Sequence, residues 1–381
     1  MPRASLSSLL LGVLLAASAP AQEPPPGAVL ATLPFLESGE VNRIFVDLAK
    51  PDSRRRLRLM LDTGASDSIL TAGAAREAGV RVRRLKRDPY RRSTLLGRDL
   101  LFHIDARRSE TASRTGWEYG LLGGTFLADY VLELDFEARV VRMIDPDRYE
   151  VPERVEAEGE VVLPLEVVAN RAGLVMTVQG RPVRVLLDTG VPFGLLLSGA
   201  VAERAGVASR AVPGFQLSGV FGELGSELGE AERTALGPFE IERYPVAVAR
   251  HGNFNQGFPA DSIIGYDLLS QFQVRVDYPR RRLWLRRREG APETFLGVDY
   301  AVYRESGALL VPHPEGYQVL LVDEGSVAAA RGTAPGMVLS EPKIPAGEDR
   351  GTMRPATRGA DVAAREAAAE VDPEALAPVR P

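Results

Sequence analysis

The sequence predicts a mainly β protein with two similar lobes and short helices, followed by a smaller partial module and a disordered tail. The first reason is a repeat: RLMLDTGASDSILTAGAAREAGV, from Arg58 to Val80, recurs with one inserted residue as RVLLDTGVPFGLLLSGAVAERAGV, from Arg184 to Val207. The second reason is that each copy is followed by a Gly-centred step and by residues that alternate between apolar and charged. A repeat of this length indicates two copies of one supersecondary unit.

Each copy of the repeat divides into the same four parts. An apolar run enters Asp-Thr-Gly, a second apolar run follows, and an Ala-rich stretch ends in Ala-Gly-Val. This order predicts a strand, a tight turn, a strand and a short helix. We expect Gly79 and Gly206 to end the two helices, because glycine adopts the left-handed conformation that follows a helix.

Two hairpins are predicted downstream, in YGLLGGTFLADYVLELDFEARVVRMI from Tyr119 and in DSIIGYDLLSQFQVRVDYPRRRLWL from Asp261. In the first, apolar and charged residues alternate up to a turn at 137–139; in the second they alternate on both sides of Pro279. This pattern predicts antiparallel pairs with one buried face. We therefore place lobe one at 29–149 and lobe two at 161–288, with a linker between them, a module at 294–341 and a disordered tail at 342–381.

The first 21 residues are typical of an export signal. Arg3 is followed by an apolar run from Leu6 to Ala17, and Ala19 and Ala21 form a small-residue cleavage pattern. We expect a signal peptide at 1–21 and a periplasmic or secreted protein without a stable membrane span after cleavage. An uncleaved anchor is the alternative, but the run is shorter than the ~20 residues that a spanning helix needs.

Composition excludes several kinds of site. The chain has no cysteine, so disulfides and thiolate chemistry are ruled out. A net charge of -5, without a basic patch interleaved with aromatic residues, argues against nucleic-acid binding. His103, His251 and His313 are isolated, which disfavours a zinc peptidase, and no Gly-x-Ser-x-Gly is present for a serine hydrolase. We expect neither metal nor cofactor.

Asp62 and Asp188 are the predicted catalytic pair, because two like motifs in two like lobes can be brought face to face by a pseudo-twofold axis. Two carboxylates about 4 Å apart repel by about 4 kcal/mol at an effective dielectric near 20, which is about three pKa units. Such a pair holds one shared proton, as in the aspartic peptidases. A water between them can then be deprotonated by one carboxylate while the other polarises a peptide carbonyl.

The other residues of the two turns have predicted supporting roles. Gly64 and Gly190 allow close approach, since a Cβ there would crowd the partner lobe. Thr63 and Thr189 are expected to exchange hydroxyl hydrogen bonds across the interface. We expect Ser66 to hydrogen-bond Asp62. One isolated Asp-Thr-Gly would be an ordinary turn sequence, but a duplicated context argues against that interpretation.

With these motifs, residues 30 to 288 resemble the retropepsin-like aspartic peptidase family, in its bacterial form with two lobes in one chain. The motif DTGAS at Asp62 matches the family's active-site motif, and LLG and IIG resemble its Gly-centred step. The resemblance implies β-barrel lobes, a peptide or protein substrate, and packing of the step under the catalytic turn. The step residues are Leu122, Gly123, Ile264 and Gly265.

The second motif departs from the family, because DTGVP places Pro192 where a hydroxyl residue is preferred. We expect weaker hydrogen bonding of Asp188. A substrate-covering flap is predicted in the Gly-rich stretch 218–229, with Gly219, Phe221 and Gly222 near its tip; 93–104 is the weaker candidate in lobe one. Phe221 is either a substrate contact or a buried aromatic residue.

The segment from Thr294 to Glu341 resembles a truncated PDZ domain. EGSVAAARG stands where that family begins a helix, and PGMVLSE stands at its Pro-Gly turn, with Met337 in place of the expected Asp. The resemblance implies binding of a peptide at a sheet edge. Two alternatives remain: a peptide-binding or scaffold protein with weak or no hydrolysis, and lobes that pair between two chains instead of within one.

Overall fold

The computed structural model describes residues 23–36, 42–49, 56–77, 90–95, 98–105, 120–155, 157–216, 218–219, 222–251, 257–342 and 354–355. The predicted signal peptide, Gly79 and nearly all of the predicted tail lie outside these ranges. The described part of the chain is mainly β, with helices of only three to seven residues.

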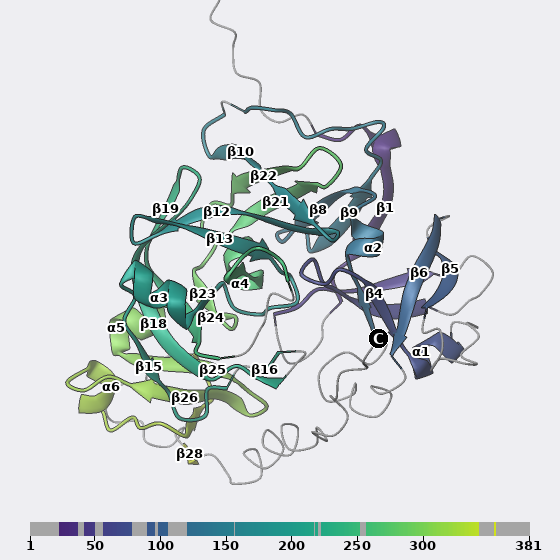
Figure 1. The fold of residues 1–381 in the computed structure, drawn as a ribbon. Coiled ribbons are helices and arrows are strands. Elements are labelled where there is room, and N and C mark those ends of the chain that lie inside the picture. Colours follow the sequence, from purple (N-terminus) through teal and green to yellow (C-terminus); the bar gives the residue numbers. More distant parts are fainter. Residues whose placement is uncertain are drawn as a thin grey trace, which may run out of the picture.

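A six-stranded sheet joins the two repeats (Figure 1). Its order is β1-β9-β8-β21-β22-β10, so each half of the chain supplies three strands. At its centre β8 and β21 are antiparallel, with Glu133 opposite Arg275. These two residues hold the same place in the repeats LELD and VRVD, so the pseudo-twofold axis passes between them. The strands are β1 (Val29–Pro34), β8 (Val131–Asp135), β9 (Val140–Ile144), β10 (Glu160–Pro164), β21 (Phe272–Asp277) and β22 (Arg282–Arg287).

The hairpins β8–β9 and β21–β22 form where they were predicted. The expectation that only one face would be buried is wrong, because Glu133 and Arg275 are fully buried as well. The 3-10 helix η1 (Pro26–Ala28) and the segment 149–151 cover this second face, and Trp284 packs among them. A polar face covered in this way must satisfy its charges internally.

Lobe one, taken here as the described residues of 29–149, contains a second sheet of order β2-β3-β7-β4-β6-β5. The turn that begins at Asp62, the first predicted catalytic residue, lies between β3 and β4, and β7 pairs with both of these strands. The elements are β2 (Phe45–Ala49), β3 (Arg56–Leu61), β4 (Ser68–Thr71), α1 (Ala72–Glu77), β5 (Tyr90–Leu95), β6 (Arg98–Asp105), β7 (Gly120–Leu122) and α2 (Gly124–Leu127).

Lobe two, the described residues of 161–288, repeats this plan in a sheet of order β11-β12-β13-β20-β14-β19-β18-β15. Its helix α3 is capped by Ser198 and ends at Gly206, which has φ 73° as predicted. The elements are β11 (Glu166–Val168), β12 (Arg171–Val178), β13 (Arg181–Leu187), β14 (Leu195–Ser198), α3 (Gly199–Ala205), β15 (Ser209–Ala211), β16 (Ser218–Gly219), β17 (Gly222–Glu223), β18 (Ser226–Leu236), β19 (Phe239–Ala249), β20 (Ser262–Ile264) and α4 (Tyr266–Leu269).

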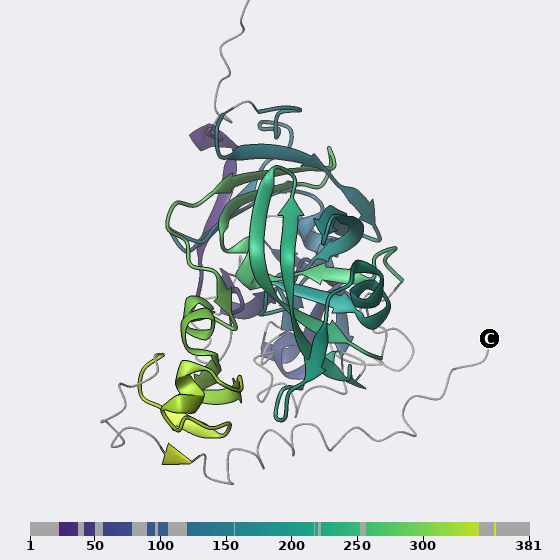
Figure 2. The ribbon, with the colours of Figure 1, turned by 90° about the vertical axis from the view of Figure 1, so that its left-hand side faces the viewer.

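The remaining elements form a C-terminal module, defined as residues 294–342 with 354–355. Figures 1 and 2 show it against lobe two, near β15 and β18. Phe295, Tyr300 and Leu309 share a hydrophobic cluster with Phe215 and Leu228 of lobe two. The two-residue strand β28, which pairs with β27, lies within the predicted disordered tail. The elements are β23 (Thr294–Phe295), β24 (Val298–Asp299), α5 (Ala301–Ser306), β25 (Ala308–His313), β26 (Gly316–Val322), α6 (Val327–Ala330), β27 (Met337–Leu339) and β28 (Arg354–Pro355).

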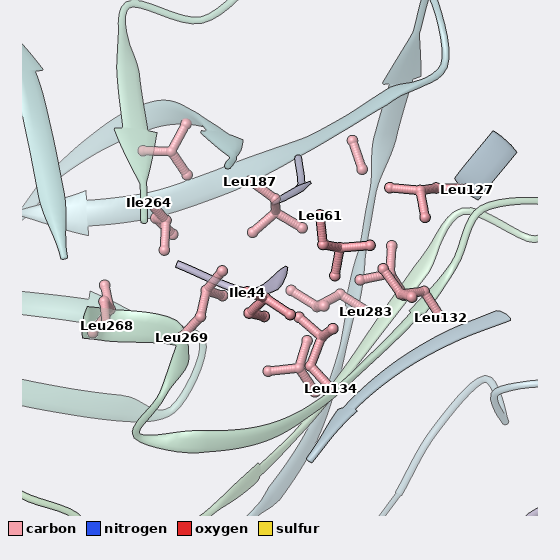
Figure 3. Packing of buried hydrophobic residues seen from close by; sticks show 14 of the residues in the cluster. Ile44, Leu61, Leu127, Leu132, Leu134, Leu187, Ile264, Leu268, Leu269 and Leu283 are labelled. Atoms are coloured by element: carbon pink, nitrogen blue, oxygen red, sulfur yellow. The ribbon is translucent and has the colours of Figure 1, made fainter. Parts of the chain in front are cut away.

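Both lobes share one large core. Figure 3 shows buried side chains from the two repeats in a single cluster, including Leu61 and Leu187, which directly precede the two predicted catalytic aspartates. Because the core is continuous, the relative position of the lobes is fixed by packing as well as by the shared sheet.

Candidate active site

Each predicted catalytic aspartate begins a turn at the end of a strand, and its backbone N–H is hydrogen-bonded to the neighbouring Gly-centred step. The Asp62 N–H donates to the Leu122 carbonyl at 3.1 Å, and the Asp188 N–H donates to the Ile264 carbonyl at 2.9 Å. These bonds continue the parallel pairs β3–β7 and β13–β20. The Gly-centred step therefore lies directly beneath each turn.

The glycines of these steps have no room for a side chain. A Cβ on Gly123 would lie 2.2 Å from the carbonyl oxygen of Asp67, and one on Gly265 would lie 2.1 Å from that of Phe193. Contacts this short are excluded by atomic radii, so both positions require glycine to keep the turn seated on the step.

The two turns face each other across the pseudo-twofold axis. A Cβ on Gly64 would lie 2.3 Å from the carboxyl carbon of Asp188, and one on Gly190 would lie 3.0 Å from that of Asp62. The carboxyl groups of Asp62 and Asp188 are within hydrogen-bonding range of each other. The structure thus brings together two side chains that are 126 residues apart in the chain.

Thr63 and Thr189 lock the two turns together. The Thr63 hydroxyl donates to the Leu187 carbonyl at 2.9 Å, and the Thr189 hydroxyl donates to the Leu61 carbonyl at 2.6 Å. Each hydroxyl also accepts the backbone N–H of the other threonine, at 3.1 and 3.2 Å. Both threonines are buried, so this reciprocal set fixes the spacing of the aspartates.

The hydrogen bonds of the two carboxyl groups are not equal. Asp62 Oδ1 accepts from the N–H groups of Gly64 at 3.0 Å and Ala65 at 2.9 Å, whereas Asp188 Oδ1 accepts from that of Gly190 at 2.8 Å. Among the described residues, no bond joins the Ser66 hydroxyl to Asp62, so that expectation is wrong. Asp188 is thus bound by fewer donors than Asp62, as expected, but the donor that differs is a backbone N–H, that of Ala65 against that of Val191, and not a side-chain hydroxyl.

Burial raises the pKa of both aspartates. The pKa of Asp188 is raised well above its ordinary value, because the charge of nearby Asp62 adds to the cost of burial. The pKa of Asp62 is raised by burial but lowered by the hydrogen bond from Asp188 and by those of the turn. Two turn N–H groups bind Asp62 and one binds Asp188, and this geometry favours a singly ionised pair with the charge on Asp62.

Two arginines near the pair were not predicted from the sequence. Arg43 Nε donates to the Gly190 carbonyl at 3.1 Å, and its charge lowers the pKa of both aspartates. Arg171 is buried, lies 5.6 Å from the ring centre of Phe258, and interacts electrostatically with both aspartates. The sequence contains a signal for them. Asn-Arg occurs at 42–43 and again at 170–171, and each copy precedes the strand that leads into a predicted catalytic aspartate.

The predicted flap of lobe two is a small hairpin. Ser218 and Gly219 pair with Gly222 and Glu223, while Phe221 lies outside the described residues. Below this tip β15 pairs with β18, so the hairpin extends from the sheet of lobe two. The weaker candidate, 93–104, forms β5 and β6, and β6 pairs with β4. That stretch is an integral part of the lobe-one sheet.

An apolar cavity of about 270 Å³ lies elsewhere, between lobe two and the C-terminal module. Leu228, Phe295, Tyr300 and Leu309 contribute to its lining.

Within the described ranges, no group of three or more histidine, aspartate or glutamate side chains is placed to hold a metal ion. No described helix has both the length and the apolar character needed to cross a membrane.

Comparison with family models matches residues 174–268 to the family described as aspartyl protease. The match runs from β12 to α4, and so includes Asp188, its turn and the Gly-centred step of lobe two. It supports an aspartic protease fold for this part of the chain. The comparison with curated proteins gave no significant match.

Solved structures that are similar to the chain include two proteases and one globulin. A retropepsin-like aspartic protease from Rickettsia conorii is 16% identical, with 33% of this chain and 89% of that chain covered and a TM-score of 0.26. Basic 7S globulin from soybean is 11% identical, covering 67% and 94%, with a TM-score of 0.37. EIAV protease in complex with the inhibitor HBY-793 is 24% identical, covering 26% and 85%, with a TM-score of 0.21.

Proposed function

We propose that this chain is an exported aspartic endopeptidase that hydrolyses peptide bonds with a water activated between Asp62 and Asp188. The observation that carries the proposal is the paired turn. Two carboxyl groups face each other within hydrogen-bonding range, and Thr63 and Thr189 hold them in place. The aspartyl protease match over lobe two supports the same reaction class.

The unequal environments of the pair suggest different roles. In the singly ionised pair Asp62 is the base that takes a proton from the water, and Asp188 donates a hydrogen bond to the scissile carbonyl. The water oxygen attacks the carbonyl carbon to give a tetrahedral intermediate. As the C–N bond breaks, Asp62 returns the proton it took from the water to the leaving amine, and the pair is again singly ionised. No covalent bond to the protein forms at any step.

The hairpin β16–β17 is the candidate flap, in agreement with its Gly-rich sequence. The periplasm or the cell exterior is the proposed location, from the N-terminal signature of Arg3 and the apolar run after it.

A peptide-binding protein with weak hydrolysis is the second candidate. Its supporting observation is that Asp188 accepts one backbone N–H where Asp62 accepts two. A carboxyl group with fewer hydrogen bonds is held less firmly in the orientation that hydrolysis requires, which slows the reaction.

Cleavage of casein between pH 3 and pH 8 tests the proposal, with wild type compared with Asp62→Asn and Asp188→Asn. We expect wild type to cut, either substitution to abolish cutting, and a statine-type transition-state mimic to inhibit it. A folded wild type that never cuts, or a variant that cuts undiminished, would make peptide binding the leading account.

A further inference from the structure

Asp267 is a fully buried carboxylate that the catalytic reaction does not use. It lies in α4, two residues after Gly265, and its exposed fraction is 0%. No salt bridge to it is formed within the described part of the chain. A charge buried without a cation is costly, so hydrogen-bond donors must compensate for the lost water.

Four donors from two other parts of the molecule surround this carboxylate. The Asn42 amide of lobe one donates to Oδ1 at 2.6 Å, and the Thr294 hydroxyl of the C-terminal module donates to the same oxygen at 2.7 Å. The Leu296 N–H donates to Oδ2 at 2.6 Å, and the Gly297 N–H also binds the carboxylate. We call Asp267 and these four donors the carboxylate cage.

The backbone of the module is shaped for this contact. Leu296 and Gly297 form the two-residue turn between β23 and β24, with φ of 51° and 80°. Left-handed values at both positions are typical of a tight hairpin turn, and successive N–H groups in a turn can bind an anion. A Cβ on Gly297 would lie 2.8 Å from the Asn42 amide nitrogen, so lobe one packs directly on the turn.

Short connections lead from the cage to the second catalytic turn. Next to Asn42, Arg43 donates to the Gly190 carbonyl at 3.1 Å. Next to Asp267, the Tyr266 N–H donates to the Val191 carbonyl at 2.8 Å. Gly190 and Val191 are the second and third residues after Asp188. A shift of Asn42 or of Asp267 would therefore move the backbone that orients the Asp188 carboxyl group.

We propose that Asp267 is a positioning residue: through the carboxylate cage, the C-terminal module holds lobe one and α4 in the arrangement that aligns the Asp188 turn. This rests on the proposed peptidase function. A consequence is that the N–H groups of Leu296 and Gly297 are occupied by the chain's own carboxylate, so an incoming peptide carboxylate would have to displace Asp267 to use them.

A charge exchange between two cage residues tests the proposal. Asn42→Asp places a second carboxylate beside Asp267, and Asp267→Asn turns an amide toward the N–H groups of the module. We expect each single variant to lower kcat about tenfold or more, with a smaller change in KM, and to move the pH profile. The double variant restores one donor and one acceptor, and its kcat should return to within about threefold of wild type.

Asp299→Asn is the matched control, because it removes an exposed carboxylate of the same module whose partner is the Ala301 N–H. Its kcat and pH profile should match wild type. Amide hydrogen exchange at Leu296, Gly297 and Tyr266 gives a readout that does not need activity. We expect faster exchange at all three in both single variants and recovery in the double variant.

Three outcomes separate the possibilities. If the single variants keep wild-type kcat and pH profile and lose protection only at Leu296 and Gly297, Asp267 merely anchors the module and the proposal is overturned. A double variant no better than the singles also overturns it. If wild type cuts nothing, the proposed function fails, and exchange at Tyr266 alone decides whether the cage reaches the turn.

Discussion

At the scale of single residues, the turn glycines decide how closely the two carboxyl groups approach. A Cβ on Gly64 would lie 2.3 Å from Asp188, but one on Gly190 would lie 3.0 Å from Asp62. We therefore expect Gly64→Ala to abolish measurable cleavage and Gly190→Ala to reduce kcat less severely. Gly73→Ala, in helix α1, is the control, since a Cβ at this position would lie 3.9 Å from its nearest neighbour, the Thr71 hydroxyl. Equal losses in the two turn variants would contradict the steric argument.

Arg43 acts on the pair through its charge. A nearby cation stabilises the ionised carboxylates and lowers the pKa of both Asp62 and Asp188. Removing the charge should raise these pKa values, and because one carboxylate must be ionised, the acidic limb of kcat/KM should move to higher pH. We expect this shift in Arg43→Gln but not in Arg43→Lys, as measured by pH profiles.

The control for this prediction is Arg58→Gln, which removes an exposed arginine that pairs with Asp47 at 3.4 Å. Its profile should coincide with that of wild type. An Arg43→Gln profile with an unmoved acidic limb would mean that Arg43 acts only by its hydrogen bond to the Gly190 carbonyl.

At the scale of elements, the contact between β8 and β21 contains an ion pair that is buried on both sides. Arg275 binds Glu133 and also donates to Tyr149 at 3.0 Å, and its guanidinium lies 4.3 Å from the ring centre of Trp284. Both charges are 0% exposed. A pair made of two copies of lobe one would place one Glu133 opposite the other, and the two like charges would repel. The opposite charges of Glu133 and Arg275 therefore favour the pairing of lobe one with lobe two.

Removing one partner should cost more than removing both. Arg275→Leu leaves Glu133 buried beside Arg142 alone, and we expect about 3–5 kcal/mol of lost unfolding free energy. Glu133→Leu combined with Arg275→Leu should regain at least half of this loss, because no charge remains buried. Denaturant unfolding measures both. Arg286→Leu, which removes a half-exposed arginine from β22, is the control.

The elements also show which features the sequence can predict. The repeat at Asp62 and Asp188 predicted both turns, the helix end at Gly206 and the two hairpins, because each is encoded by adjacent residues. Glu133 was assigned to an exposed face, since alternation reveals only that two faces differ. The second face is covered by η1 and residues 149–151, whose sequences have no periodic pattern. Contacts between distant segments, such as Asn42 with Asp267, leave no local pattern.

At the scale of the whole molecule, lobe two packs against both lobe one and the C-terminal module, and lobe one also reaches the module through Asn42. The six-stranded sheet joins the lobes, and the cluster of Phe215, Leu228, Phe295 and Tyr300 attaches the C-terminal module to lobe two. The candidate flap also belongs to lobe two, and the apolar cavity lies at the base of its strands β15 and β18. The module and the candidate flap hairpin are therefore both attached to lobe two.

The buried carboxyl groups should make the whole protein more stable in mild acid than at neutral pH. Burial raises the pKa of Asp62, Asp188 and Asp267, the last from 3.8 to about 6. A group with a raised pKa binds its proton more tightly in the folded state, so its contribution to stability appears as pH falls through the folded pKa and is lost as pH rises through it. For Asp267 this amounts to roughly 3 kcal/mol between about pH 7 and pH 3, of which somewhat less than half appears by pH 5.

The free energy of unfolding at pH 7, 6 and 5, from denaturant titrations, measures this effect. We expect a rise on acidification in wild type and a clearly smaller rise in Asp267→Asn, whose side chain does not titrate. The measurements stop at pH 5 because other carboxylates act in the opposite direction in stronger acid. The hydrogen bond from Arg250 lowers the pKa of Glu227, so the contribution of Glu227 to the stability of the protein is lost when it is protonated. Wild-type stability that falls steadily from pH 7 to pH 5 would show that these carboxyl groups are not buried as charged groups in the folded protein.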